Sequence, residues 1–323
     1  MRDFFSEDDL TIINFEGVLK DDSRDAVNKT YCFRGPTDFA RILPLSSIEA
    51  VNLDNNHTLD YGKRGKTSTV EALTGAGVHV FDELTPYIFE KDGIKIAFFG
   101  MQRVHFFSLR EQLKEQIRIL REEEGVNAII FAQHAGTEYS SQHTNAQIDL
   151  AHKLIDMGAD FIAGSHPHVV QGMEVYNGRY IFYSMGNFCF GGNSSPSDMD
   201  TMIYQQTFTI DADGVKKDNV TNIIPCSISS AAYDGYNNYQ PTPAEGDEAT
   251  RILGKINERS SWISTAEGST FTAKYNSNND SQSSSADTAA SDSDIVDMNS
   301  SASDDTDAET YDESYDTDNS DAE

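Results

Sequence analysis

Short apolar runs that alternate with helix-like segments constrain the fold of this chain more than any other feature. Runs rich in β-branched residues at Leu10–Asn14, Ile48–Leu53 and Val126–Ala132 predict buried strands. Strand–helix–strand alternation of this kind implies parallel strands. The other expected elements of this part are helices at Thr37–Leu43, Gly65–Thr74, Ser108–Glu123 (with Ser108 as its N-cap) and Thr144–Met157, and a strand at Asp160–Ala163.

Hairpins are more frequent in the later part of the chain, and hairpins imply antiparallel strands. Tyr87–Phe99 is expected to turn at Asp92-Gly93, and Val169–Ser184 at Asn177-Gly178. Two further strands are expected at Thr201–Ile210 and Gly214–Ile224, before a last helix at Ala244–Ser260. A mixed α/β sandwich accommodates both the parallel and the antiparallel strands.

The charge balance excludes several classes of partner. The chain has 53 Asp and Glu against 24 Lys and Arg, a net charge of −29. This acidity argues against nucleic acid as the main partner and against docking on anionic lipid. Because no run of about 18 apolar residues exists, no transmembrane segment is expected, and no signal peptide or anchor is visible. Three scattered cysteines are too few for a disulfide framework or a cysteine-based zinc site.

The acidic residues are concentrated at the end of the chain. From Tyr275 onward there are 15 Asp and Glu and no Lys or Arg. Such a segment cannot bury enough apolar surface to offset the entropy of ordering it. We therefore expect residues 1–262 to form one globular domain and residues 263–323 to be a disordered acidic tail. The tail is either a solvated segment without a specific partner, or a spacer or cation-collecting stalk.

Polar side chains follow the expected strands. Asn14 and Glu16 come after the first, Asp54–Gly62 after the second, and His134 and His166-Pro-His168 after two later ones. Ligands of open α/β sheets bind beyond the carboxyl ends of the strands. Histidine, carboxylate and amide oxygen together suit Mn, Fe or Zn. The sequence thus predicts a divalent transition-metal site of one or two ions, where a further histidine could protonate a leaving oxygen.

Each piece alone has a simpler interpretation. Asn14-Phe-Glu16 can be a turn, the Asn56–Gly62 segment a capped loop, and His134 a half-buried histidine. Arg34 is equally a solvated loop arginine or an anion contact. A metal site is indicated because these Asn, Glu, Asp and His residues follow one strand after another along the chain. The remaining histidines are expected to be structural or surface residues without such partners: His79, His105, His143 and His152.

Four motifs together resemble the signatures of the CapA-type capsule synthesis proteins, also called poly-γ-glutamate biosynthesis (PgsA-like) proteins, of the calcineurin-like metallophosphoesterase superfamily. The motifs are Asn14-Phe-Glu-Gly17, Asn52–Gly62, Gly164–Val169 and Tyr183–Phe188, and the resemblance covers roughly residues 8–230. It implies a four-layer α/β/β/α sandwich around a metal centre. It also implies work at the bacterial cell surface, outside the cytoplasm, on an anionic polymer or its precursor, with other assembly proteins as partners.

The resemblance implies roles for individual residues. Glu16 corresponds to the carboxylate that bridges two ions, Asn56 and His134 to ligands, and His166 and His168 to paired ligands, one for each metal. His57 corresponds to the general acid, and Asp60 orients it. The candidate substrate or anion contacts are Asn14, Arg34 and Asn187.

One feature of the family has no counterpart here, namely a first strand ending in Gly-Asp whose Asp belongs to the first metal. We expect the sandwich to lack that strand and the first-metal site to be incomplete. One metal would keep Glu16, Asn56, His134 and His166, and the other only Glu16 and His168. The chain is then expected to be an N-terminally truncated product, an incomplete gene model or a short divergent form. Three hypotheses follow: a metal-dependent hydrolase of a phosphoester or polymer bond, a non-catalytic accessory of polymer assembly, and a non-functional fragment.

Overall fold

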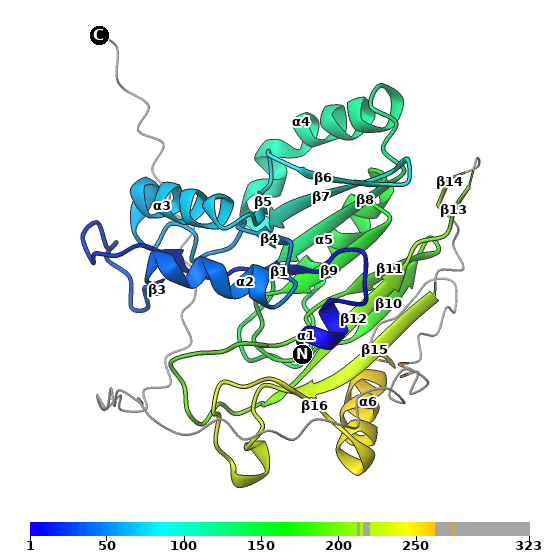
Figure 1. Cartoon of the computed structure of the whole chain (residues 1–323). Helices are drawn as coiled ribbons and strands as arrows, with labels where there is room; N and C mark the ends of the chain where they lie inside the picture. The colour runs from blue at the N-terminus through cyan, green and yellow to red at the C-terminus, as the bar shows by residue number, and fades with distance from the viewer. Residues whose placement is uncertain (212–213, 216–219, 262–272, 274, 276–323) are drawn as a thin grey trace. The chain divides into compact units, whose positions relative to one another are not determined.

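A six-stranded mixed sheet is the largest sheet in the computed structural model, which describes residues 1–211, 214–215, 220–261, 273 and 275 (Figure 1). Its order is β10-β11-β9-β8-β7-β6. The strands span Tyr87–Lys91 (β6), Ile94–Gln102 (β7), Ala128–His134 (β8), Phe161–Ser165 (β9), Met173–Tyr176 (β10) and Arg179–Phe182 (β11). The four inner strands run parallel, and β6 and β10 are antiparallel hairpin partners. Both hairpins turn at the predicted Asp-Gly and Asn-Gly pairs, whose φ angles are all positive, as tight hairpin turns require.

A smaller parallel sheet carries the N-terminal part of the site. It consists of β1 (Ile12–Asn14), β4 (Ala50–Asn52) and β5 (His79–Phe81), and Asn14 is in register with Asn52. Helix α3 (Gly62–Gly75) links β4 to β5. Strand β5 was not predicted, because its short apolar run, residues 78–81, is interrupted by His79. The nearby short elements are α1 (Arg2–Phe5), β2 (Val18–Leu19), β3 (Arg34–Gly35), η1 (Thr37–Arg41) and α2 (Ile42–Leu45), the last two in place of the single helix expected there.

Two helices cover one face of the six-stranded sheet. Helices α4 (Arg103–Glu122) and α5 (Asn145–Asp156) bury Leu113 and Leu150 against Phe131 of β8 in one apolar cluster. Helix α5 begins with a capping box, in which Thr144 and Gln147 exchange side-chain and backbone hydrogen bonds. The opposite face of the sheet, including Phe98 and Phe161, packs against the small parallel sheet and Tyr204.

A third sheet and the last helix complete the described part. The sheet contains β12 (Asp200–Thr207), β15 (Val220–Ser227) and β16 (Thr242–Pro243), and α6 (Gly246–Ser261) packs Ile252 and Ile256 against Met202 (Figure 1). Along the chain, β12 and β15 are separated by two short strands, β13 (Ile210–Asp211) and β14 (Gly214–Val215), and β15 and β16 by the turn η2 (Ala232–Asp234). The mixed α/β class with parallel strands is therefore confirmed, whereas the four-layer arrangement stays a prediction.

The predicted start of α4 at Ser108 is wrong. The helix begins at Arg103, with Gln102 as its N-cap, and the Ser108 hydroxyl donates to the His105 carbonyl inside the helix at 2.8 Å. The cause is Phe106, which is buried with Leu113 and Ile117 and so extends the apolar stripe of the helix toward its N-terminus. His105 therefore lies in the first helical turn, directly after β7.

The expected tail, residues 263–323, lies outside the described residues except for Ala273 and Tyr275, so its disorder stays a prediction. The described residues all belong to one compact unit, Met1–Ser277. Among the helices of the described part, none has both the length and the apolar character needed to cross a membrane.

Candidate metal centre

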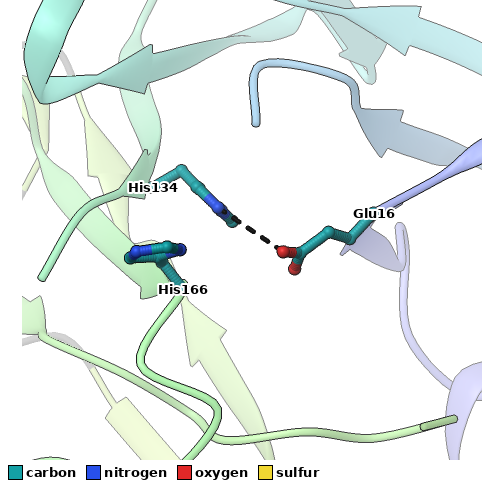
Figure 2. A group of neighbouring side chains, drawn as sticks. All are labelled: Glu16, His134 and His166. Atoms are coloured by element: carbon teal, nitrogen blue, oxygen red, sulfur yellow. Dashed lines mark ion pairs between the residues drawn. The ribbon is translucent and has the colours of Figure 1, made fainter. Parts of the chain in front are cut away.

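Strand ends from the small parallel sheet and from the six-stranded sheet bring the predicted ligands together. Glu16 follows β1, Asn56 and His57 lie in the loop after β4, His134 is the last residue of β8, and His166 follows β9. Figure 2 shows Glu16, His134 and His166 lying close together on three separate segments. One ligand atom from each lies within 4.8 Å of the other two. His168 also reaches this group, because its Nε2 lies 3.9 Å from Glu16 Oε1.

The Glu16 carboxylate lies at the centre of the cluster. Its Oε1 is 3.7 Å from His134 Nε2, 3.9 Å from His168 Nε2 and 4.0 Å from His57 Nε2. This oxygen is shielded from solvent and accepts no hydrogen bond within the described part of the chain. Burial raises the pKa of Glu16. The distances are too long for hydrogen bonds, but they approach the roughly 3.0–3.4 Å between neighbouring ligands of one ion at about 2.1 Å.

His134 presents a ligand-type nitrogen to the same point. Burial holds the pKa of His134 well below its usual value, with further lowering by His166 and His168, so the ring is neutral. Its Nδ1 lies 3.0 Å from Ser165 Oγ, and that hydroxyl donates to the Gln133 carbonyl, which assigns the ring proton to Nδ1. In this tautomer the Nε2 lone pair faces Asn56 Oδ1 at 2.9 Å as well as Glu16. Three acceptors around one point are the arrangement that a bound cation would satisfy.

The His166-Pro-His168 loop supplies two more imidazoles. His166 Nδ1 is buried without a hydrogen-bond partner among the described residues, and burial, then His168 and His57, lower the pKa of His166 to about 4. His166 and His168 have φ angles of 101° and 57°, backbone conformations that non-glycine residues rarely adopt and that concentrate at functional sites. Asn187 fixes this loop, since its Oδ1 lies 2.8 Å from His168 Nδ1 and its amide donates to the His168 carbonyl.

His57 is oriented by Asp60, as the resemblance implied. His57 Nδ1 lies 2.7 Å from Asp60 Oδ2, which also accepts from the Phe33 N–H, and Lys29 Nζ lies 3.2 Å from Asp60 Oδ1. Burial alone would raise the pKa of Asp60, but the hydrogen bonds from His57 and Phe33 outweigh it and lower the pKa. The ring of Phe33 packs on His57 at a centroid distance of 4.2 Å. These contacts point His57 Nε2 toward Glu16.

The three candidate anion contacts have recorded partners inside the protein. The Asn14 amide donates to Glu16 Oε2, and Asn14 Oδ1 accepts from Asn52 and Asn55, so Asn14 positions the central carboxylate. Asn187 positions His168 in the same way. Arg34 donates to the Lys20 carbonyl at 2.7 Å. A role for any of them in anion binding stays a prediction.

Several supporting residues were not singled out from the sequence. Asn55 and Ser165 stand inside the quoted motifs, so their position beside the ligands was the signal that could have identified them. Lys29 and Phe33 had no comparable signal, because they reach Asp60 only when the β2–β3 connection folds back over the loop after β4.

The expectation that the other histidines lack carboxylate partners is wrong for two of them. His105 Nδ1 lies 3.6 Å from Asp54 Oδ1 and 3.7 Å from Glu83 Oε1. His152 Nε2 lies 2.7 Å from Glu174 Oε1, which is buried. The two remaining histidines stack on tyrosine rings: His79 on Tyr87 and His143 on Tyr183.

Comparison with known proteins agrees with the site motifs. A sequence model of the family described as "Bacterial capsule synthesis protein PGA_cap" matches residues 1–192, more than half of the chain. The "PGA biosynthesis protein CapA" of Bacillus subtilis is 29% identical over 206 residues, 58% of this chain and 54% of that protein. The "Capsule biosynthesis protein CapA" of Bacillus anthracis is 29% identical over 213 residues, 58% of this chain and 52% of that protein.

A more distant relative and two solved structures also match. A "Probable polyglutamine synthesis accessory protein" of Mycobacterium tuberculosis is 24% identical over 208 residues, 55% of each chain. A hypothetical protein from Thermus thermophilus aligns at a TM-score of 0.44 and 17% identity, covering 69% of this chain and 90% of that chain. The calcineurin-like phosphoesterase YfkN from Bacillus subtilis aligns at 0.38 and 18%, covering 68% and 73%. The chain spans about half the length of the curated relatives it matches. Because the family model matches more than half of its residues, the chain belongs to the bacterial capsule synthesis protein PGA_cap family.

Proposed function

We propose that this chain is a metal-dependent hydrolase that works on a phosphoester or another bond of an anionic surface polymer or its precursor. The observation that carries the proposal is the buried Glu16 Oε1, which makes no hydrogen bond within the described residues and faces three histidine nitrogens at 3.7–4.0 Å. The names of the Bacillus relatives, which concern PGA and capsule biosynthesis, support the polymer as the setting. By the same likeness we propose a location at the bacterial cell surface and other assembly proteins as partners.

The donor set fits one or two divalent transition ions. Glu16, Asn56, His134 and His166 would hold one, and Glu16 with His168 would contribute to a second. Neutral imidazoles with a carboxylate and an amide oxygen suit Mn, Fe or Zn. When bound, such an ion would supply positive charge that stabilises a phosphoryl group and acidifies water.

The other residues of the site would transfer a proton or hold the ligands in position. Asp60 holds the Nδ1 proton of His57, so His57 Nε2 can carry a second proton toward the leaving oxygen. Asn14 and Asn187 keep Glu16 and His168 in place. Asn55 fixes the loop, because its amide donates to the Phe15 carbonyl and its Oδ1 accepts from the His57 N–H.

The first test measures metal content, with His134→Ala compared with wild type and with His79→Ala. His79 is the matched control, because it is exposed and stacks on Tyr87 away from the cluster. We expect at least one Mn, Fe or Zn per wild-type chain by elemental mass spectrometry, retained in His79→Ala and lost in His134→Ala. Equal metal content in all three proteins would contradict the assignment of the ligands.

Turnover is then measured on bis(p-nitrophenyl) phosphate, p-nitrophenyl phosphate and poly-γ-glutamate with the metal-loaded full chain. His57→Ala should keep its metal and lower turnover by about 10²–10⁴-fold, the usual contribution of a general acid. No turnover on any of these substrates, with His57→Ala indistinguishable from wild type, would refute the enzymatic proposal.

A second candidate function is a non-catalytic accessory that binds polymer or partner proteins. The observation in its favour is that the Mycobacterium relative carries the name of an accessory protein. Polymer binding that survives both His134→Ala and a chelator would support it, and binding that requires the metal would count against it.

A further inference from the structure

A second group of ligand-type side chains lies along the same edge of the parallel strands. Asp54 follows β4, Glu83 follows β5, and His105 stands in the first turn of α4, directly after β7. One ligand atom from each lies within 4.8 Å of the other two. None of these residues belongs to the cluster around Glu16, which follows β1, β4, β8 and β9.

The distances in this group suit a shared ion better than hydrogen bonds. His105 Nδ1 lies 3.6 Å from Asp54 Oδ1 and 3.7 Å from Glu83 Oε1, both too long for a hydrogen bond. Two ligands bound to one ion at about 2.1 Å lie roughly 3.0–3.4 Å apart. The Nδ1 atom is also shielded from solvent and has no hydrogen-bond partner within the described residues, although the rest of the ring is partly exposed.

Gln102 holds the Asp54 carboxylate in place, and the ion pair of the neighbouring lysine is with a different carboxylate, Asp82. Asp54 is 3% exposed, and Gln102 orients it through its backbone N–H at 2.9 Å and its side-chain amide at 2.6 Å. Lys66 pairs with Asp82 at 2.9 Å. Two carboxylates that face one imidazole give the group excess negative charge, which a bound cation would balance.

We propose that Asp54, Glu83 and His105 form a second cation site, for a divalent transition ion such as Zn²⁺ or Mn²⁺, separate from the centre at Glu16. One imidazole with two carboxylates is a donor set that these ions accept, and the exposed side of His105 leaves room for water ligands. The ion would tie the ends of β4 and β5 to the start of α4. It would also stiffen the loop that carries Asn56 and His57, because Asp54 begins that loop.

The test uses the full chain, stripped with a chelator and titrated with Zn²⁺ and, separately, with Mn²⁺ by calorimetry, followed by elemental analysis after gel filtration. The variants are His105→Ala, the near-isosteric Glu83→Gln, His134→Ala and the control His79→Ala. We expect His105→Ala and Glu83→Gln each to lose one class of binding, or to weaken it at least tenfold. That class should persist in His134→Ala.

Two results would overturn the proposal. One is metal binding by His105→Ala and Glu83→Gln equal to that of His79→Ala, which would make the group an ion pair around a protonated His105. The other is loss of all binding in His134→Ala, which would leave the Glu16 centre as the single site. Circular dichroism and the melting temperature of the stripped proteins show that each variant is folded, and Glu83→Gln carries the test if His105→Ala is not. Because each centre has its own variant, failure of one proposal leaves the other measurable.

Discussion

Replacing Asp60 with Asn tests the positioning of His57 without changing the shape of the side chain. Asp60 Oδ2 accepts hydrogen bonds from His57 Nδ1 and the Phe33 N–H, both at 2.7 Å, and Asp60 Oδ1 pairs with Lys29 at 3.2 Å. An amide oxygen at the Oδ2 position can still accept both bonds, but without the charge, and each then loses about 1 kcal/mol. The pair with the partly exposed Lys29 adds at most about 1 kcal/mol. The expected loss of unfolding free energy is therefore about 2–3 kcal/mol.

For a domain of this size, 2–3 kcal/mol corresponds to a fall in melting temperature of about 4–12 °C, which calorimetry measures directly. Metal content should stay at the wild-type value, because Asp60 is not a ligand, while turnover falls about 10²-fold or more. Asp38→Asn is the matched control, since its pair with Arg41 at 3.1 Å is largely exposed and should contribute little. The reasoning is refuted if Asp60→Asn and Asp38→Asn have the same melting temperature and the same turnover rate.

Three further predictions concern stability. Burial would raise the pKa of Asp200, but the hydrogen bonds from Arg251 outweigh it and lower the pKa, so Asp200 stabilises the fold above about pH 4. In urea titrations Asp200→Asn should be less stable than wild type at pH 7, and the gap should close as the pH falls below about 4. Gly164→Ala should abolish soluble expression or lower the melting temperature sharply, because the new methyl group would overlap the backbone oxygen of Tyr183 in the adjoining segment, whereas Gly191→Ala has open space. Because the net charge is −29, raising KCl from 0.1 to about 1 M should raise the melting temperature. The added salt shortens the Debye length from about 10 to 3 Å and so weakens the repulsion between like charges. A lower melting temperature would show that the loss of ion pairs outweighs the relief of this repulsion.

The cluster around Glu16 could be predicted because its residues follow strands that the sequence marks clearly. The segments that contain β1, β4 and β8 are apolar and include β-branched residues, and β1 and β4 are parallel neighbours whose carboxyl ends meet at one edge. Glu16 and Asn56 could therefore be expected near each other. His134, which ends β8 in the six-stranded sheet, reaches them because the two sheets pack together. The contacts of Lys29 and Phe33 with Asp60 could not be predicted from sequence periodicity, because they depend on the path of the long β2–β3 connection.

The group of Asp54, Glu83 and His105 was not predicted, because the strand before Glu83 was missed and the start of the helix that carries His105 was misplaced. The apolar run around β5, residues 78–81, is short and interrupted by His79, so nothing in the sequence placed Glu83 at the end of a strand. The helix expected to begin at Ser108 begins at Arg103, so His105 fell outside the expected helix, although it stands at the helix start beside β7. The error at the helix comes from weighing the polar cap Ser108 above the burial of Phe106, which only tertiary packing reveals.

Charge connects the two groups to the proposed substrate. A polyanion that comes within about a Debye length of a chain with a net charge of −29, about 8 Å at physiological salt, is repelled by it. The groups around Glu16 and Asp54 are built from buried and half-buried carboxylates and imidazoles. A divalent ion would make the Glu16 group locally positive, because it has one carboxylate, and would neutralise the two carboxylates of the Asp54 group. If both hold ions, the attraction for an anionic polymer comes from the metals rather than from a surface of Lys and Arg. Polymer affinity should then fall on chelation far more than on any single lysine substitution, and the reverse result would place the attraction in the side chains themselves.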